Sequence, residues 1–378
     1  MRFTTLSGVA ALATVLVNGA STVPAVARSG IGLSVPCDTT ALINAIATAP
    51  AGSTLVLARR CTYHLTTAYS GDDGLPRIDR QLTIEGRGSA IVRDGLTAGA
   101  FRIFHVTSTG DLRLDDITIR GGNAPGDGGG ILVDGSGKLK LDKITLDNNR
   151  AGGVGGGVDV VGGATAYIGR SQFTFNNAAE GGGLQSDGTI TTDGVVFSRN
   201  YAGVGGAIGQ EEGDAVHRNT TLNNNTPGFD GGGIDIESGT VQFINSKIIN
   251  NTTAGAQGGG IFNDTSLTLI KTEVSGNVVG GSGGKGGGIY ENFGTLVLQD
   301  SSVDHNSANG SGTSQAGGIY NTNGAVKLDH SEVNNNASTV APGGVWTDTQ
   351  FTVNRSEIRH NIPTNCNGGP VIVTGCVD

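Results

Sequence analysis

The chain has 378 residues, among them 66 glycines, and a formal net charge of −9. This acidic balance, without any basic stripe, excludes a surface built to bind nucleic acid. After the N-terminal segment, no stretch has the length of a membrane-spanning helix, so we expect no membrane span in the mature chain.

The first residues have the features of a bacterial-type secretory signal. Arg2 provides a positive start, an apolar core runs from Val9 to Val17, and Ala25-Val26-Ala27 is an A-x-A cleavage motif. A buried N-terminal helix is the alternative. We predict a signal peptide over residues 1–27, cleavage after Ala27, and a secreted mature chain that forms one domain over residues 28–378.

A short amphipathic helix is expected near the start of the mature chain. Leu42, Ile43 and Ile46 fall at helical spacing, and Asp38 or Thr39 is a suitable N-cap. This helix precedes a strand over 54–57, and residues 36–61 together are predicted to cap the domain. Less regular coils follow over 78–120, with strands over 82–84, 103–106, 112–114 and 117–119.

A glycine motif then dominates the chain to its end. Three small residues, mostly Gly-Gly-Gly, are followed by an aliphatic residue about every 26 positions, and a repeat of this length indicates stacked units. The aliphatic positions are Ile131, Val158, Leu184, Ile208, Ile234, Ile261, Ile289, Ile319 and Val345.

A second motif recurs in phase with the first. An alternating segment ends in an apolar residue and is followed three positions later by Asn, which suits a turn and can bond to its copy in the next unit. The apolar column is Leu146, Phe173, Phe197, Leu222, Ile248, Val274, Val303, Val333 and Ile358. The structural Asn column is Asn149, Asn176, Asn200, Asn225, Asn251, Asn277, Asn306, Asn336 and Asn361.

These periods predict the fold class. Segments such as 295–298 and 325–328 alternate apolar with polar residues, which is typical of half-buried strands, and the repeats show no helical periodicity. We predict an all-β protein, a single right-handed parallel β-helix of about 11–12 coils with a short N-terminal capping helix. Its regular coils should cover residues 110–370, and a monomer is expected.

Four cysteines lie at the two ends of the domain. Cys37 and Cys61 flank the first element, and Cys366 and Cys376 lie in the last turn. We expect pairing within each end, which would pin the terminal coils, although three pairings remain open on sequence alone. We expect no metal site there, because the two pairs lie at opposite ends.

The repeats resemble those of known proteins. Gly205-Gly206-Ala207-Ile208 and Phe197-Ser198-Arg199-Asn200 resemble the GGA[ILV] and FxxN signatures of polymorphic outer-membrane proteins. Gly287-Gly288-Ile289-Tyr290 is similar to repeats of bacterial secreted right-handed β-helix proteins of the pectate-lyase-like superfamily. That resemblance implies the fold over about residues 110–370. It implies no single activity, since lyases, hydrolases, adhesins and binding proteins share this fold.

One outward column provides candidate ligand-binding residues. The residue after each repeat's aliphatic position should point outward, and in the last four coils it is aromatic. Aromatic rings beside carboxylates suit sugar recognition, and a stacked ladder that covers the glycine turns is the alternative. The four aromatic residues are Phe262, Tyr290, Tyr320 and Trp346.

Acidic residues near the same column are the candidates for catalysis. Glu211, Asp235, Glu237 and Asp264 lie on neighbouring coils, where paired carboxylates could cleave a glycan or hold Ca²⁺. Solvated acidic columns usually serve only solubility, so the sequence favours no cofactor.

The sequence therefore supports three functions. We favour a secreted, non-enzymatic β-helix protein that presents a repetitive face for adhesion or for binding a polysaccharide or cell-surface ligand. A polysaccharide lyase or glycosidase is the second hypothesis, and a structural protein of the envelope or coat is the third.

Overall fold

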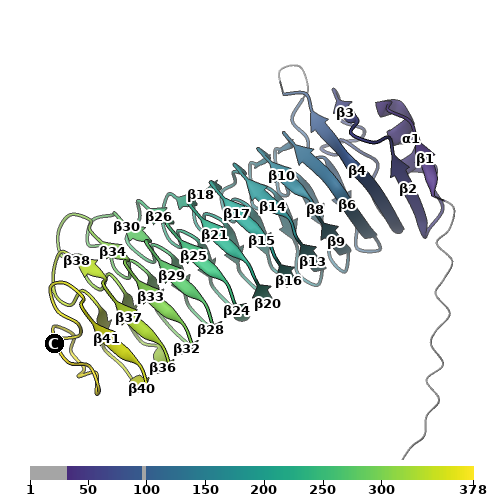
Figure 1. Cartoon of the computed structure of the whole chain (residues 1–378). Coiled ribbons are helices and arrows are strands. Elements are labelled where there is room, and N and C mark those ends of the chain that lie inside the picture. Colours follow the sequence, from purple (N-terminus) through teal and green to yellow (C-terminus); the bar gives the residue numbers. More distant parts are fainter. Residues whose placement is uncertain (1–31, 96–98) are drawn as a thin grey trace, which may run out of the picture. The chain divides into compact units, whose positions relative to one another are not determined.

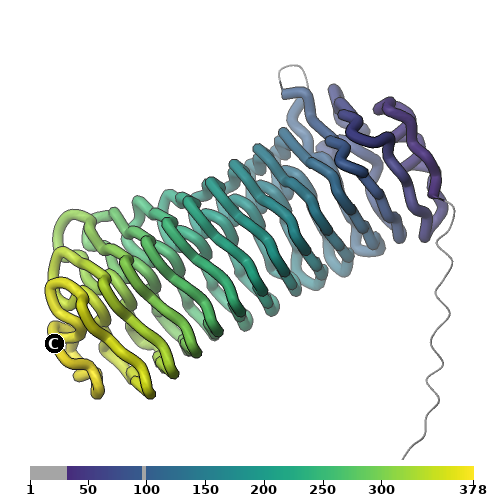
Figure 2. The backbone as a smooth tube through the Cα atoms, viewed as in Figure 1, coloured from purple at the N-terminus to yellow at the C-terminus, as the bar shows by residue number. Residues whose placement is uncertain are grey.

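The computed structural model describes residues 32–95 and 99–378, and Gly32–Asp378 form one compact unit. The predicted signal peptide, residues 1–27, lies outside the described residues. The unit is a parallel β-solenoid of about 11 turns. Figure 1 shows its stacked strands as arrows, and Figure 2 shows the path of the backbone.

The N-terminal end is capped as the sequence predicts. After β1 (Leu33–Val35) comes helix α1 (Thr39–Thr48), followed by β2 (Ser53–Leu57) and β3 (Thr62–Leu65). The Asp38 carboxylate accepts a hydrogen bond of 2.7 Å from the Ala41 amide, which confirms the N-cap. Leu42 and Ile46 are fully buried in the main core, so the helix closes the open end of the first coil.

Two long strands form the irregular coils that follow. β4 (Gln81–Arg93) pairs in parallel with β6 (Asp111–Arg120), and their register shifts between Glu85 and Ser89. The separate strands expected over 112–114 and 117–119 are therefore one strand. Asp116 adopts a left-handed φ of 55°, which lets β6 bend at the coil's corner without ending.

Each regular coil contributes two strands to a 23-stranded sheet that also contains β1–β4 and β6. The longer strands are β9 (Lys138–Asp142), β13 (Thr165–Gly169), β16 (Thr189–Asp193), β20 (Asp214–Arg218), β24 (Thr240–Ile244), β28 (Ser266–Ile270), β32 (Thr295–Gln299), β36 (Ala325–Asp329) and β40 (Phe351–Asn354). The shorter strands are β10 (Thr145–Asp147), β14 (Gln172–Thr174), β17 (Val196–Ser198), β21 (Thr221–Asn223), β25 (Lys247–Ile249), β29 (Glu273–Ser275), β33 (Ser302–Asp304), β37 (Glu332–Asn334) and β41 (Glu357–Arg359).

The glycine motif leads into a separate ten-stranded sheet, and two-residue strands complete the coils. The ten strands are β5 (Phe104–Val106), β8 (Ile131–Val133), β12 (Val158–Val160), β15 (Leu184–Ser186), β19 (Ile208–Gln210), β23 (Ile234–Ile236), β27 (Ile261–Asn263), β31 (Ile289–Glu291), β35 (Ile319–Asn321) and β39 (Val345–Thr347). The two-residue strands are β7 (Asn123–Ala124), β11 (Arg150–Ala151), β18 (Tyr201–Ala202), β22 (Thr226–Pro227), β26 (Thr252–Thr253), β30 (Val278–Val279), β34 (Ser307–Ala308) and β38 (Ala337–Ser338).

The register of the coils confirms both predicted columns. Val158 pairs with Leu184 and Leu184 with Ile208, and the aliphatic column continues without a slip to Val345. The second column pairs Leu146 with Phe173 and continues to Ile358 in the same way. Every member of both columns belongs to the main core, so stacking buries one narrow apolar stripe.

The Asn column forms the predicted ladder inside the turns. The side-chain oxygen of Asn251 accepts from the backbone amide of Asn225 at 3.0 Å and from its side-chain amide at 2.9 Å. The Asn251 side-chain amide in turn donates to Asn277 Oδ1 and to the Leu222 carbonyl, both at 3.0 Å. The same pattern repeats from Asn149 to Asn361, so each Asn fastens its coil to the next.

Disulfides close both ends of the unit. Cys37 pairs with Cys61 beside the capping helix, and Cys366 pairs with Cys376 in the last turn. Both expected pairings are therefore confirmed.

Candidate binding surface

The outer side of the ten-stranded sheet carries the candidate residues. The first and third residues of each strand point into the core, so the central residue points outward. We call these central residues the outer column: His105, Leu132, Asp159, Gln185, Gly209, Asp235, Phe262, Tyr290, Tyr320 and Trp346.

The outer column is far less exposed than the sequence suggested. Gln185 is only 1% exposed, while Asp235, Tyr290 and Tyr320 are each 5% exposed. The column points outward from the core, as predicted, but most of its residues are buried. Around Gly209, Glu180 precedes a glycine motif, Glu211 and Glu237 follow two strands, and all three line the same hollow.

The four aromatic residues form a cluster of their own, apart from the main core. Phe262, Tyr290, Tyr320 and Trp346 stack with ring centroids 5.4, 5.3 and 4.2 Å apart and interplanar angles of 2–4°. Lys285 lies 4.8 Å above the Tyr320 ring. The inner rings thus have their faces covered by one another, and burial raises the pKa of the Tyr290 and Tyr320 hydroxyls.

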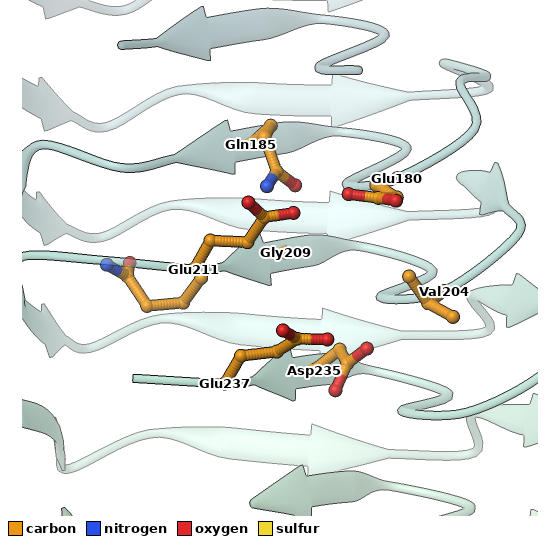
Figure 3. Close-up of a pocket in the computed structure, with 8 residues that line it drawn as sticks. Glu180, Gln185, Val204, Gly209, Glu211, Asp235 and Glu237 are labelled. Atoms are coloured by element: carbon orange, nitrogen blue, oxygen red, sulfur yellow. The ribbon is translucent and has the colours of Figure 1, made fainter. Parts of the chain in front are cut away.

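Three of the four acidic candidates line one small hollow, shown in Figure 3. Glu211, Asp235 and Glu237 come from the strand β19 and β23 coils, and Asp264 lies one coil further along. Figure 3 shows the Glu211 carboxylate directed towards Gln185 and the Glu237 carboxylate beside Asp235. The hollow is lined by Glu180, Gln185, Val204, Gly209, Gln210, Glu211, Asp235 and Glu237.

A glycine in the outer column creates this hollow. Gly209 stands between Gln185 and Asp235, so the column has a gap one side chain deep. A Cβ atom at Gly209 would lie 2.0 Å from the side-chain oxygen of Gln185. The Gln185 oxygen therefore occupies space that only glycine leaves open at this position.

Several buried oxygens around the hollow have no hydrogen-bond partner. They are Gln185 Oε1 and Asp187 Oδ1 on the coil of β15, Asp235 Oδ1 on the coil of β23, and Asp264 Oδ1 on the coil of β27. Each is an acceptor, and leaving a buried acceptor unpaired costs about 1–3 kcal/mol. The arrangement is therefore suited to a ligand that donates hydrogen bonds or carries positive charge.

The carboxyl groups in and beside the hollow hold protons more strongly than usual. Contact with Glu180, together with burial, raises the pKa of Glu211 to about 7, and the neighbouring Gln185 amide offsets part of this rise. Burial and Glu237 raise the pKa of Asp235, and burial and Asp127 raise that of Asp159 to about 8. Burial is also the main cause of the raised pKa values of Glu237 and Asp264.

Sequence reasoning missed Glu180, the partner of Glu211. Glu180 directly precedes Gly181-Gly182-Gly183, and the structure brings this position over the outer column of the next coils. The same position holds Asp127, Asp230 and Lys285 in other coils. The recurrence of charged residues directly before the glycine motif is the signal in the sequence that indicates this second flank.

A charged cluster at the first coil was also missed. His105 Nδ1 lies 3.2 Å from both oxygens of the fully buried Asp73, and His105 Nε2 lies 2.7 Å from Asp134. Arg102 and Arg77 also bind Asp73, at 2.6 and 2.7 Å. Burial lowers the pKa of His105, but its bonds to Asp73 and Asp134 outweigh this and raise it overall. Each charged side chain of the cluster contacts one of opposite charge, which indicates a structural seal at this end.

Within residues 32–95 and 99–378, no three His, Cys, Asp or Glu side chains already converge as a metal centre. In the same part of the chain, no helix is long and apolar enough to cross a membrane.

Comparison with known proteins defines the class. The structure is that of a β-helix protein. Its coils are parallel, its Asn ladder is in register, and its outer column lies on one sheet. The family model for the right-handed β-helix region matches residues 102–301, which is 200 of the 378 residues, so the chain belongs to the right-handed β-helix family. Neither the curated proteins nor the solved structures contain a match to the chain.

Proposed function

We propose that the protein is a secreted, non-enzymatic β-helix protein whose outer column and flanking side chains bind an extended carbohydrate. The main support is the row of unpartnered buried acceptors on successive coils, which sugar hydroxyls could satisfy in register. Two disulfides agree with an oxidising, extracellular location. The resemblance of the repeats to pectate-lyase-like and polymorphic outer-membrane proteins agrees with a surface-binding role.

The charges favour one class of glycan. The acidic residues Asp187, Glu211, Glu237 and Asp264 follow one another on the same flank, and none is joined in the described part of the chain by an ion pair to Lys, Arg or His. A polyuronate would add negative charge to this row and be repelled. Neutral sugars and sugars with free amino groups would instead donate hydrogen bonds to it.

The aromatic cluster has a narrower role than an open sugar platform. Because Tyr290 and Tyr320 are buried with their faces stacked, they offer ring edges to a ligand. Phe262 and Trp346, at the two ends of the stack, are the more exposed rings. We therefore assign most of the affinity for the glycan to the acidic hollow and the coils beside it. The aromatic cluster would align the glycan chain along the surface.

A polysaccharide-cleaving activity is the second candidate, because of the contact between Glu180 and Glu211. The pKa of Glu211 is raised to about 7, so this group can donate a proton near neutral pH, and the Glu180 carboxyl group lies beside it. A neutral glycan positioned over them could be hydrolysed. A structural role in the envelope or coat requires no ligand and predicts neither binding nor cleavage.

A glycan panel read for both binding and cleavage tests these functions. The mature protein should bind neutral or amino glycans and ignore polyuronates, and Glu211→Gln with Asp235→Asn should weaken binding about tenfold, which corresponds to about 1.4 kcal/mol. Asp300→Asn, an exposed carboxylate in the turn after β32, is the matched control and should bind normally. New reducing ends that disappear in Glu211→Gln would establish cleavage instead, and absence of binding across the panel would exclude the carbohydrate proposal.

A further inference from the structure

The acidic hollow contains more negative charge than its surroundings compensate. Glu180 and Glu211 are in contact, and Glu237 lies beside Asp235. Within residues 32–95 and 99–378, none of these four carboxylates forms an ion pair with a basic side chain. Only a proton or a bound cation can relieve such a contact.

An independent observation comes from a side chain without charge. Gln185 is 1% exposed and its side-chain oxygen has no partner, although its amide lies beside Glu211. That oxygen lies directly over the gap left by Gly209. This neutral oxygen is buried without a hydrogen-bond partner, beside carboxylates and at the place where Gly209 has no side chain. It is therefore available as a ligand for a cation.

The size of the hollow limits its occupant. Its volume of about 10 Å³ is roughly what a single water-sized sphere needs. A sugar ring is too large to enter, so a glycan would cover the hollow from outside. The occupant must be one small species, and all the unpartnered atoms that face it are acceptors.

Oxygen-only ligands with several carboxylates select hard divalent cations. Ca²⁺ accepts six to eight oxygen ligands in adaptable geometry, whereas Mg²⁺ demands a near-ideal octahedron. We propose that the acidic hollow is a Ca²⁺ site, formed by Glu180, Glu211, Asp235 and the side-chain oxygen of Gln185, with Glu237 at its edge. The site shares residues with the proposed glycan-binding surface, but Ca²⁺ binding is measured without any glycan, so the two proposals can fail separately.

Closing the site requires only side-chain movement. The carboxylates do not yet meet at one point, but Glu180 and Glu211 are long and partly exposed, while Gln185 and Asp235 are held by the buried sheet. The ion would take the place of the proton that Glu211 retains because of its contact with Glu180 and its burial. Binding should therefore release protons and strengthen as the pH rises through about 7.

Calorimetric titration of CaCl₂ into EDTA-treated mature protein tests the site. At about pH 8 we expect one ion per chain with a dissociation constant on the order of 10⁻⁴–10⁻³ M, and about tenfold weaker binding at about pH 5.5. The heat at intermediate pH should depend on the ionisation enthalpy of the buffer, because protons are released. MgCl₂ should bind more weakly.

Variants distinguish this site from general surface charge. Glu211→Gln and Gly209→Ala should each weaken Ca²⁺ binding about tenfold or more, since one removes a ligand and the other displaces the Gln185 oxygen. Gly209 does not have a left-handed φ, so the alanine variant should fold, which circular dichroism checks. Asp300→Asn should bind as the unmodified protein does. Absence of Ca²⁺ heat at about pH 8, or equal binding by Glu211→Gln, would show that a proton or water alone fills the hollow.

Discussion

Two polar columns run through the same stack of coils, and they differ in how their hydrogen bonds are used. In the Asn column, from Asn176 onward, each side-chain oxygen accepts from the Asn of the preceding coil, as Asn251 does from Asn225. In the outer column and its acidic flank, one side-chain oxygen each of Gln185, Asp187 and Asp235 accepts no hydrogen bond. Both columns are largely buried and both follow the repeat.

The difference shows what stacking alone can provide. An amide side chain carries donor and acceptor together, so identical copies satisfy one another and the column becomes structural. A carboxylate has only acceptors, so identical copies repel and leave lone pairs unused. A repeated acidic column therefore depends on something from outside the chain, a proton, a cation or a ligand.

The largest expected effect comes from breaking the satisfied column. Asn251→Ala removes the acceptor of two Asn225 groups and the donors to Leu222 and Asn277, all of them buried. We expect a loss of about 4 kcal/mol in the free energy of unfolding, measured by urea denaturation. Asn309→Ala, at an exposed position outside the column, should change it by less than about 0.5 kcal/mol. A similar small change for both variants would contradict the structural role of the ladder.

The aromatic cluster should give the next largest effect. Tyr320→Ala removes a ring that stacks on both Tyr290 and Trp346, so we expect a loss of about 3 kcal/mol in unfolding free energy. Tyr320→Phe keeps the stack and should cost less than about 0.5 kcal/mol. The phenylalanine variant is therefore the cleaner probe of glycan binding, because loss of binding in the alanine variant would also follow from local unfolding. Equal stability of the two variants would show that the stack contributes nothing.

Much of the fold could be predicted from the sequence, because the same motifs recur in each coil and specify the same local structure each time. The Asn residues, the aliphatic positions and the cap at Asp38 each follow from local rules, and the disulfide partners follow from their places at the ends. The burial of the outer column could not be predicted. Alternation gives the direction in which Tyr290 and Asp235 point, but not how far neighbouring side chains extend over them. The hollow likewise depends on a missing side chain at Gly209 and on Glu180, which lies on the flank opposite Glu211.

A buried carboxyl group on the inner side of the ten-stranded sheet provides a third case to compare with the two polar columns. Glu291 is fully buried, accepts from Asn263 at 2.5 Å, and has a second oxygen without a partner. Burial raises its pKa to about 9, above the unfolded value of about 4.3, so the folded state holds the extra proton between these values. Its contribution to stability is therefore complete below about pH 4.3 and is lost as the pH rises towards about 9.

Replacing this carboxyl by an amide should remove that dependence. Glu291→Gln is expected to match the unmodified protein at about pH 4 and to exceed it by on the order of 2 kcal/mol at about pH 6, because the amide never ionises. Thermal unfolding across this pH range measures the difference. A constant offset between the two proteins at every pH would mean that Glu291 does not titrate in this window.

The smallest expected effect lies at the exposed edge of the acidic hollow. Burial, with Glu211 and Asp264 nearby, raises the pKa of Glu237, so Glu237→Gln should relieve repulsion and slightly raise the unfolding midpoint at about pH 8. Since the side chain is exposed, we expect only a few tenths of a kcal/mol, vanishing in about 1 M salt. Added Ca²⁺ should reverse the sign, because the variant then lacks a charge beside the bound ion. Asp300→Asn should show neither the rise in the unfolding midpoint nor its change of sign with Ca²⁺. The same response in both variants would show that net charge alone causes the effect.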